Sequence, residues 1–267
     1  MKKYLPFLAL AASACQPHTA ANLPAASAAP AAIATAPAPT DSTAAVLQLA
    51  QQVDLAPAWL GDARHEAMEG FYGPDNYRMS FYFDNVRRDS LQPNVFHFRG
   101  RDRYKKIITP FTGTITVTRL AALPDTASVL TSQANRGYTA FASFELRETA
   151  ATKGAGHCQG RATLDFQVSP QHQATQAFGM DMDTGQENPT IGCGLIFEGT
   201  WQDNQTGRHQ PVAWANYYGV IVPSALAKMG LGMRSEEVNP KLAKYGWNTI
   251  MENDEWWADS PKPKLTL

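Results

Sequence analysis

The motifs that mark several common enzyme classes are missing from this chain of 267 residues. There is no G-x-S-x-G nucleophile motif, no H-E-x-x-H zinc motif and no glycine-rich phosphate-binding loop. His65 and Glu66 lack the second histidine that a metal-binding helix needs. We therefore predict a protein that is not an enzyme and that needs no cofactor and no metal. A catalytic site that only the folded chain assembles would leave no such motif.

The chain also lacks an excess of charge of one sign and long apolar runs. It has 23 Lys and Arg against 24 Asp and Glu, so its composition gives no sign of a nucleic-acid partner. A transmembrane helix needs roughly 20 apolar residues, and no segment of the chain offers them. We expect any contact with a membrane to be made by an anchor.

What is present begins with the first fifteen residues. Lys2 and Lys3 give a positive start, residues 4–11 are mostly apolar although Pro6 interrupts them, and small residues follow at 12–14. This arrangement is typical of an export signal that is removed from the mature protein.

Residues Ala12-Ser13-Ala14-Cys15 resemble the lipobox of bacterial lipoproteins. In that class the cysteine becomes the new N-terminus and is lipidated, so the resemblance implies a membrane anchor at Cys15. Ala12-Ser13-Ala14 also fits an ordinary A-x-A cleavage site, and plain secretion is the alternative. Gln16, where some lipoproteins carry a retaining aspartate, favours the outer membrane of the cell envelope by the same resemblance.

Composition divides the remainder into two parts. Residues 16–43 are dominated by Ala, Pro, Thr and Ser and predict a disordered tether, because they offer too little apolar surface to offset the entropy of ordering. Residues 44–267 predict a single β-rich domain. It begins with a short helix, for which Val46, Leu49 and Val53 give the apolar stripe and which Pro57 ends.

Strict alternation of apolar and polar residues dominates this domain. Phe111, Gly113, Ile115 and Val117 alternate with four threonines, which predicts a strand with one buried face. Similar segments predict further strands at 67–72, 77–84, 95–108, 138–147, 158–168, 173–180, 195–201 and 212–218. Short helices at 223–229 and 239–246 are expected to cover one end or edge of the sheet.

The series of short strands leaves a barrel or a sandwich as the fold class. Gly113 and Gly199 lie inside predicted strands, where glycine often marks a bend or a bulge. We predict a curved antiparallel β-barrel, lipocalin-like in broad shape, with a β-sandwich as the alternative.

Two cysteines, Cys158 and Cys193, remain after Cys15. An even count in an oxidising compartment predicts a disulfide, and two free buried thiols are the alternative.

Two groups of side chains are candidates for ligand binding. If 95–108 is one strand, Arg99, Arg101, Arg103 and Lys105 share a face and could hold an anionic ligand or a lipid headgroup. A turn at 100–102 would scatter them, and a solvated outer face is the simpler interpretation. Trp256 and Trp257 are adjacent, so a strand would point them to opposite faces and leave one free to stack on a sugar.

Residues 181–188 resemble a calcium-binding loop in composition but lack two of its ligands, so a polar loop is the simpler interpretation.

We predict an exported, lipid-anchored envelope protein whose non-catalytic barrel binds a small or lipid-like ligand or serves as a structural module. One alternative is a glycan-binding sandwich. The second is a hydrolase with a carboxylate pair drawn from Asp181, Asp183, Glu187 and Glu198, separated by roughly 5 to 10 Å for glycoside chemistry.

Overall fold

The structure is a computed structural model, which describes part of the chain. The described residues are 42–61, 66–123, 136–151, 154–177, 180–181, 186–187, 194–231, 240–250 and 255–258. By its internal contacts the chain divides into residues 1–39 and 40–267, and every described residue belongs to the second unit. The predicted leader with Cys15 lies outside the described residues, as does the predicted tether up to residue 41.

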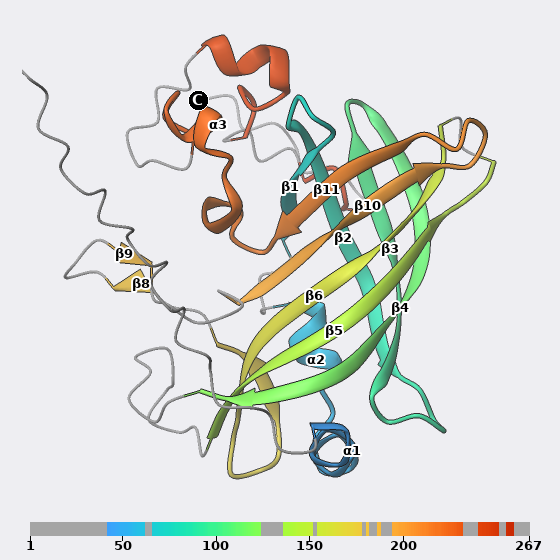
Figure 1. Cartoon of the computed structure of the whole chain (residues 1–267), viewed down its shortest axis with the longest axis vertical. Helices are drawn as coiled ribbons and strands as arrows, with labels where there is room; N and C mark the ends of the chain where they lie inside the picture. Colours follow the sequence, from blue (N-terminus) through green and yellow to red (C-terminus); the bar gives the residue numbers. More distant parts are fainter. Residues whose placement is uncertain are drawn as a thin grey trace, which may run out of the picture. The chain divides into compact units, whose positions relative to one another are not determined.

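An antiparallel sheet that closes on itself forms the body of the second unit (Figure 1). Its strands are β1 (Met68–Tyr72), β2 (Tyr77–Arg88), β3 (Val95–Tyr104), β4 (Ile107–Ala122), β5 (Arg136–Glu148), β6 (Gly156–Val168), β7 (Ala174–Gln176), β10 (Leu195–Asp203) and β11 (His209–Ala215). Strands β1 to β6 pair in sequence order, β10 pairs with β6 and β11, and β11 returns to β1. These eight strands form a ring, and β7 pairs with the end of β6 that β10 leaves free. The ring confirms the predicted barrel-like sheet against the sandwich.

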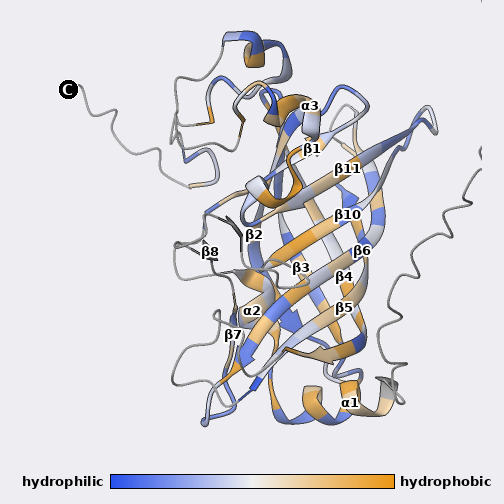
Figure 2. Ribbon diagram, turned by 60° about the vertical axis from the view of Figure 1, so that its left-hand side comes forward, coloured by the Kyte–Doolittle hydropathy of each residue, from blue (hydrophilic) through white to orange (hydrophobic). Residues whose placement is uncertain are grey.

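Alternation along strands such as β3, β4 and β5 separates a buried inner face from a polar outer face (Figure 2). On β4 the side chains of Phe111, Ile115 and Val117 are buried inside the ring, while the threonines between them point outwards. Aromatic rings fill much of the interior, and Trp214 stacks on Phe81 and Phe197 at centroid distances of 4.0 and 4.8 Å. The middle of the ring is therefore a packed core.

Glycines inside the strands serve close packing. A Cβ atom at Gly113 would lie 2.4 Å from the ring of Phe98 and 2.2 Å from the carbonyl oxygen of Glu145. The register shifts that bend the sheet occur elsewhere, between Phe83 and Asn85 and between Val117 and Arg119. The pairing register runs unbroken through Gly113 and Gly199, so neither glycine marks a bulge.

Two helices close one end of the ring, the lower end in Figure 1. These are α1 (Ser42–Gln52) and α2 (Ala56–Leu60), and Pro57 lies in the first turn of α2. Trp59 of α2 is fully buried, with its ring 6.4 Å from Phe96 and 6.3 Å from Phe197. No helix in the described part of the chain is long and apolar enough to span a membrane.

The C-terminal segments cover the outer face of β1. They are η1 (Tyr218–Ile221), α3 (Ser224–Ala227) and η2 (Pro240–Tyr245), and Trp247 after them packs on Phe71 at 4.7 Å. Beneath this cover the guanidinium of Arg78 donates to both carboxylate oxygens of Glu69, at 2.8 and 2.7 Å. The predicted helices at 223–229 and 239–246 correspond to α3 and η2.

The predicted disulfide is not formed in the structure, because Cys158 is a free, buried thiol. Its side chain has an inward position on β6, where Leu146 and Trp201 are its neighbours in register. Burial raises the pKa of the Cys158 thiol. Cys193 lies outside the described residues.

A small hairpin of β8 (Met180–Asp181) and β9 (Gln186–Glu187) carries part of the segment 181–188, whose composition resembles a calcium-binding loop. Residues 182–185 between these strands lie outside the described part of the chain. Among the described residues, no group of three or more His, Cys, Asp or Glu side chains is placed to hold a metal ion.

Candidate ligand-binding site

The end of the ring opposite α1 and α2 contains a pocket of about 390 Å³. We call this end the mouth and this space the mouth pocket. It lies among the ends of β1, β3, β5 and β10 and the beginnings of β2, β4 and β11. The residues that shape its floor and walls are Tyr72, Asp102, Tyr104, Thr109, Glu148 and Trp201.

Two carboxyl groups lie on the floor because their positions follow the inward alternation of their strands. On β3 the buried positions are Phe96, Phe98, Gly100 and then Asp102, and on β5 they end with Leu146 and Glu148. Strand β4 separates β3 from β5, and its Thr109 pairs with Asp102 in register. The alternation that fills the ring with apolar side chains thus turns two acids inwards at the mouth.

The two acids are buried, and their hydrogen bonds differ. Asp102 is 1% exposed and Glu148 is 8% exposed. Glu148 accepts a hydrogen bond at Oε2 from the backbone N–H of Gly156, at 2.6 Å, and at Oε1 from the indole N–H of Trp201, at 3.0 Å. Asp102 makes a side-chain hydrogen bond with Glu148, whereas as a carboxylate its Oδ2 would have no donor.

These surroundings decide where the proton lies. Burial raises the pKa of Asp102 well above its usual value, and the charge of Glu148 adds to the effect. Burial raises the pKa of Glu148 too, but the N–H groups of Gly156 and Trp201 favour its charged form. Asp102 is therefore the member of the pair that keeps its proton to the higher pH, and Glu148 is the member whose charged form is favoured.

Aromatic rings surround this pair. The ring of Tyr72 lies 4.8 Å from Tyr104 and 5.4 Å from Trp201, measured between centroids. Burial raises the pKa of the Tyr72 hydroxyl to about 12, although a hydrogen bond from Arg208 acts in the opposite direction. The pocket thus has an acidic floor and aromatic walls.

Three charged residues stand at the rim, and each has its own partners. The ammonium of Lys105 lies over the rings of Tyr77 and Tyr104, at 5.4 and 5.2 Å. Arg208 is bound to the hydroxyl of Tyr72. Backbone N–H groups of the β10–β11 turn hold the pKa of Asp203 below its usual value.

The arginines predicted to share a face do so on the outside of the ring. Strand β3 runs without a turn through residues 100–102, and Arg99, Arg101 and Arg103 all point outwards. Lys105 does not belong to this face, because it lies in the β3–β4 turn with a φ of 59°.

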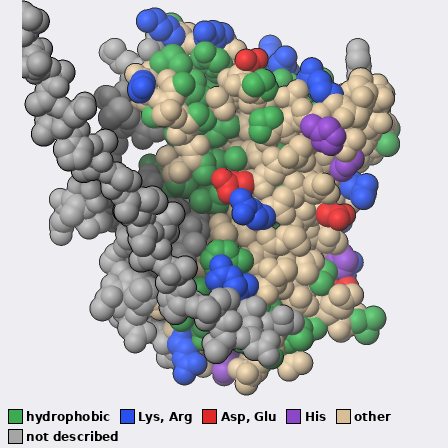
Figure 3. Space-filling model, in the orientation of Figure 1, with side chains coloured by type: hydrophobic (Ala, Val, Ile, Leu, Met, Phe, Trp, Pro, Cys, Tyr) green, Lys and Arg blue, Asp and Glu red, His purple; other side chains and the backbone are tan. Residues whose placement is uncertain are grey.

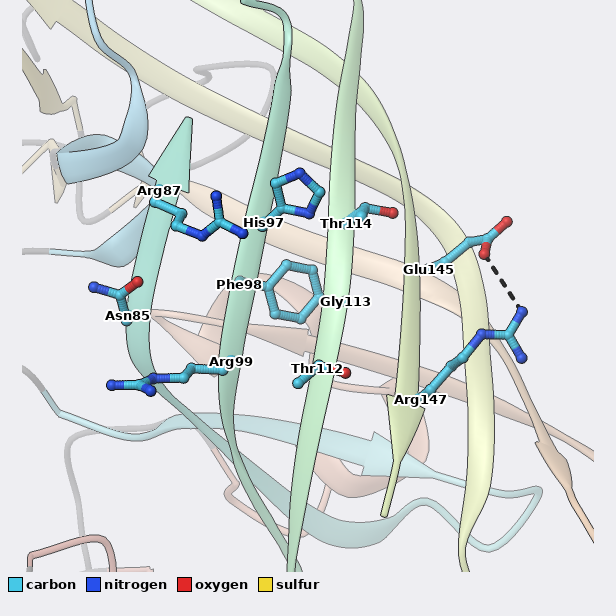
Figure 4. Close-up of a pocket in the computed structure, with 10 residues that line it drawn as sticks. All are labelled: Asn85, Arg87, His97, Phe98, Arg99, Thr112, Gly113, Thr114, Glu145 and Arg147. Carbon is cyan, nitrogen blue, oxygen red and sulfur yellow. Dashed lines mark ion pairs between the residues drawn. The ribbon is translucent and has the colours of Figure 1, made fainter. Parts of the chain in front are cut away.

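A shallow groove of about 590 Å³ crosses this outer wall (Figure 4). Arg99 and Arg147 extend to opposite sides of it, and Arg147 lies 3.7 Å from the carboxylate of Glu145. His97 is bound to Asp89 at 2.8 Å. In the view of Figure 3 acidic and basic side chains are interspersed over the surface. The basic groups of the groove do not converge on one point, as recognition of a small anion requires.

The predicted tryptophan pair meets the arginine face. The guanidinium of Arg103 lies 5.1 Å from the ring centroid of Trp256, and Trp257 stacks on Tyr82 at 5.8 Å. Both tryptophans are half-buried, so neither stands free of the wall. The arginine face and the tryptophan pair, which the sequence suggests as two separate binding groups, therefore lie together against β2 and β3.

The carboxylates named from the sequence do not form the acid pair. Glu198 points outwards on β10 and is exposed, Asp181 and Glu187 belong to the β8–β9 hairpin, and Asp183 lies outside the described residues. The pair that forms is Asp102 with Glu148. A signal for it existed, because both acids occupy positions of the apolar alternation.

Comparisons with protein-family models, curated proteins and solved structures find no match for this chain.

Proposed function

We propose that this chain is an exported cell-envelope protein, anchored to the outer membrane by a lipidated Cys15, whose barrel-like domain binds a small ligand without catalysis. The observation that carries the proposal is the mouth pocket, where a buried acid pair lies beneath aromatic walls. Its volume of about 390 Å³ falls within the range of roughly 300 to 1,000 Å³ that is usual for small-molecule sites.

The acid pair favours a binding role over a purely structural one. Burying a charge without a counter-charge costs stability, and well-packed apolar side chains would stabilise a barrel end better. The interior below the pocket is filled in that way, by Phe81, Phe111 and Trp214 among others. Two acids at the open end are a costly feature unless they contact something that enters.

The sequence supports the cellular location. The positive start, the apolar run and Cys15 fit export and anchoring, and an alanine- and proline-rich tether would let the domain stand off the bilayer. Intact-mass measurement of the protein from its own membrane fraction checks this part. A mature chain that begins at a lipidated Cys15 is expected, and an unmodified cysteine would refute the anchor.

The geometry of the acid pair argues against glycoside hydrolysis, the reaction considered for the hydrolase alternative. Asp102 and Glu148 are hydrogen-bonded to each other, whereas the two carboxyl groups of glycoside hydrolases stand roughly 5 to 10 Å apart. The glycan-binding alternative requires a freely exposed tryptophan that can stack on a sugar. Trp256 packs against Arg103 and Trp257 against Tyr82, which argues against that role.

Native mass spectrometry after mild extraction tests ligand binding at the mouth. The wild type is expected to carry a reproducible extra mass. Met79→Trp, which enlarges a buried side chain that lines the pocket, should lose it. Arg99→Ala on the outer wall is the control and should keep it. Retention of the mass by Met79→Trp, or its loss only in Arg99→Ala, would refute the proposed site.

A further inference from the structure

The acid pair in the mouth pocket has no counter-charge among the described residues. Within the described part of the chain no Lys, Arg or His forms an ion pair with Asp102 or Glu148; the charge of Glu148 acts on Asp102, and that of Asp203 acts on Glu148. Lys105 and Arg208 contact tyrosines at the rim instead. Oδ2 of Asp102 has no hydrogen-bond partner among the described residues, although Asp102 is almost fully buried.

The walls of the pocket suit a positive charge. Tyr72, Tyr104 and Trp201 surround the floor, and the faces of such rings attract cations that have lost their water. Ion pairing with a buried carboxylate is stronger than in solvent, because the surroundings screen it less. A negative ligand would instead face the charge of Glu148, and the two described cations at the rim, Lys105 and Arg208, are held on tyrosines.

Resting on the proposed binding function, we infer that the ligand is an organic ammonium ion with an apolar body, whose N–H groups take the place of the proton between Asp102 and Glu148. On binding, the O–H bond of Asp102 breaks and its proton passes to solvent. Both carboxylates then accept hydrogen bonds from the ammonium, and the apolar body contacts the aromatic walls. The pocket exchanges one cation for another.

A metal ion fits this site less well than an ammonium ion. Calcium takes six to eight oxygen ligands, and the described residues place no third acidic or histidine side chain beside the pair. The aromatic walls match the apolar body of an organic ligand.

Proton exchange gives the inference a direct signature. Because binding releases one proton, the dissociation constant should fall as pH rises, by up to about tenfold per pH unit while the free pair stays protonated. In the described residues, the other titratable groups that face the pair are Tyr72, Tyr104, Cys158, Asp203, Lys105 and Arg208. Burial raises the pKa of Tyr72 and Cys158, and that of Asp203 is lowered, so these three do not exchange protons near neutral pH. His157 and His209 have outward positions on their strands.

Calorimetric titration of the full mature chain tests the inference with three probes that share one apolar body. They are 2-phenylethylammonium, 2-phenylethanol and phenylacetate, and each is titrated in two buffers with different heats of ionisation. We expect the ammonium probe to bind at least about tenfold more tightly than the alcohol, with release of about one proton. The carboxylate probe should bind most weakly.

Variants separate the roles of the two acids. Asp102→Asn should still bind the ammonium probe but release no proton, because the exchangeable proton is gone. Glu148→Gln should lose the preference for the ammonium probe over the alcohol. Asp84→Asn is the matched control, because Asp84 is an acid on the outer wall that pairs with Arg101 at 2.7 Å.

The outcomes distinguish this inference from the proposed function. If the alcohol and the ammonium probes bind equally and Met79→Trp blocks both, the pocket binds ligands but does not select a cation, and the inference is overturned. If the ammonium probe binds Glu148→Gln as tightly as the wild type, the inference is likewise overturned. If no probe binds and Met79→Trp retains the natural cargo, the inference and the proposed function both fail.

Discussion

Asp102 makes the stability of the fold depend on pH, and replacing it with asparagine should weaken that dependence. Asparagine has nearly the same shape as a protonated aspartic acid and can donate an N–H to Glu148. The folded protein holds the proton of Asp102 more tightly than the unfolded chain does, because burial raises the folded pKa. The stabilisation this gives is complete below the unfolded pKa and is lost as pH rises towards the folded pKa.

The magnitude follows from the proton count. One proton bound only by the folded state changes the free energy of unfolding by about 1.4 kcal/mol per pH unit. The loss begins near the unfolded value, about 3.9 for aspartate, and continues up to the raised folded value. Asp102→Asn should remove this slope, so the variant gains on the wild type with each pH unit in that interval.

Urea unfolding between about pH 5 and about pH 8 measures the effect, because extrapolation gives the free energy of unfolding at each pH. Asp84→Asn serves as the control, since Asp84 lies on the outer wall and is only partly buried. Identical pH slopes for the wild type and Asp102→Asn would refute a proton held by Asp102. A loss of stability at every pH with an unchanged slope would show a packing role alone.

Three further predictions concern the frame around the pocket. Gly113→Ala should destabilise the fold by about 1 to 3 kcal/mol, because the added Cβ meets the ring of Phe98 at 2.4 Å. Glu69→Gln should cost about 3 to 5 kcal/mol, since it replaces the carboxylate that accepts two hydrogen bonds from the buried Arg78 with a neutral amide. Trp59→Ala should cost about 3 to 5 kcal/mol, because it empties the closed end of the ring. Urea unfolding at one pH measures all three.

Matched controls for these variants lie on exposed surfaces. Thr112→Ala changes the outward neighbour of Gly113, and Glu145→Gln removes an exposed partner of Arg147. Each should change stability by less than about 1 kcal/mol. If Gly113→Ala changed stability as little as Thr112→Ala, the close packing at Gly113 on β4 would be refuted. If Glu69→Gln changed it as little as Glu145→Gln, the stabilising role of the Glu69–Arg78 ion pair would be refuted.

Strands with regular alternation could be predicted from the sequence, and the reason is physical. On β4 and β6 one face fills the ring and the other meets solvent, so the period of two appears directly in the residue types. The turn between β3 and β4 was missed because Lys105 and Lys106 form it without glycine or proline. Residues 95–108 therefore appeared to be a single strand.

The candidate site depends on topology that the sequence does not reveal. Asp102 and Glu148 meet because β4 lies between their strands and sets both registers. Asp102 also stands between Arg101 and Arg103, whose outward side chains give this part of β3 a basic pattern in the sequence. Similarly, the sequence predicts that Pro57 ends one helix, whereas Pro57 lies in the first turn of α2, which carries Trp59 into the ring.

The most direct test of ligand binding at the mouth is the indole N–H spectrum of the six tryptophans, recorded by nuclear magnetic resonance. The protein is measured as isolated with its natural cargo and again after unfolding and refolding have removed it. The indole of Trp201, which donates to Glu148 at 3.0 Å, should shift most, while that of Trp247, which donates to the carbonyl of Asn76 at 3.1 Å, should stay in place. A shift confined to Trp256 and Trp257 would place the ligand on the outer wall and contradict the mouth pocket.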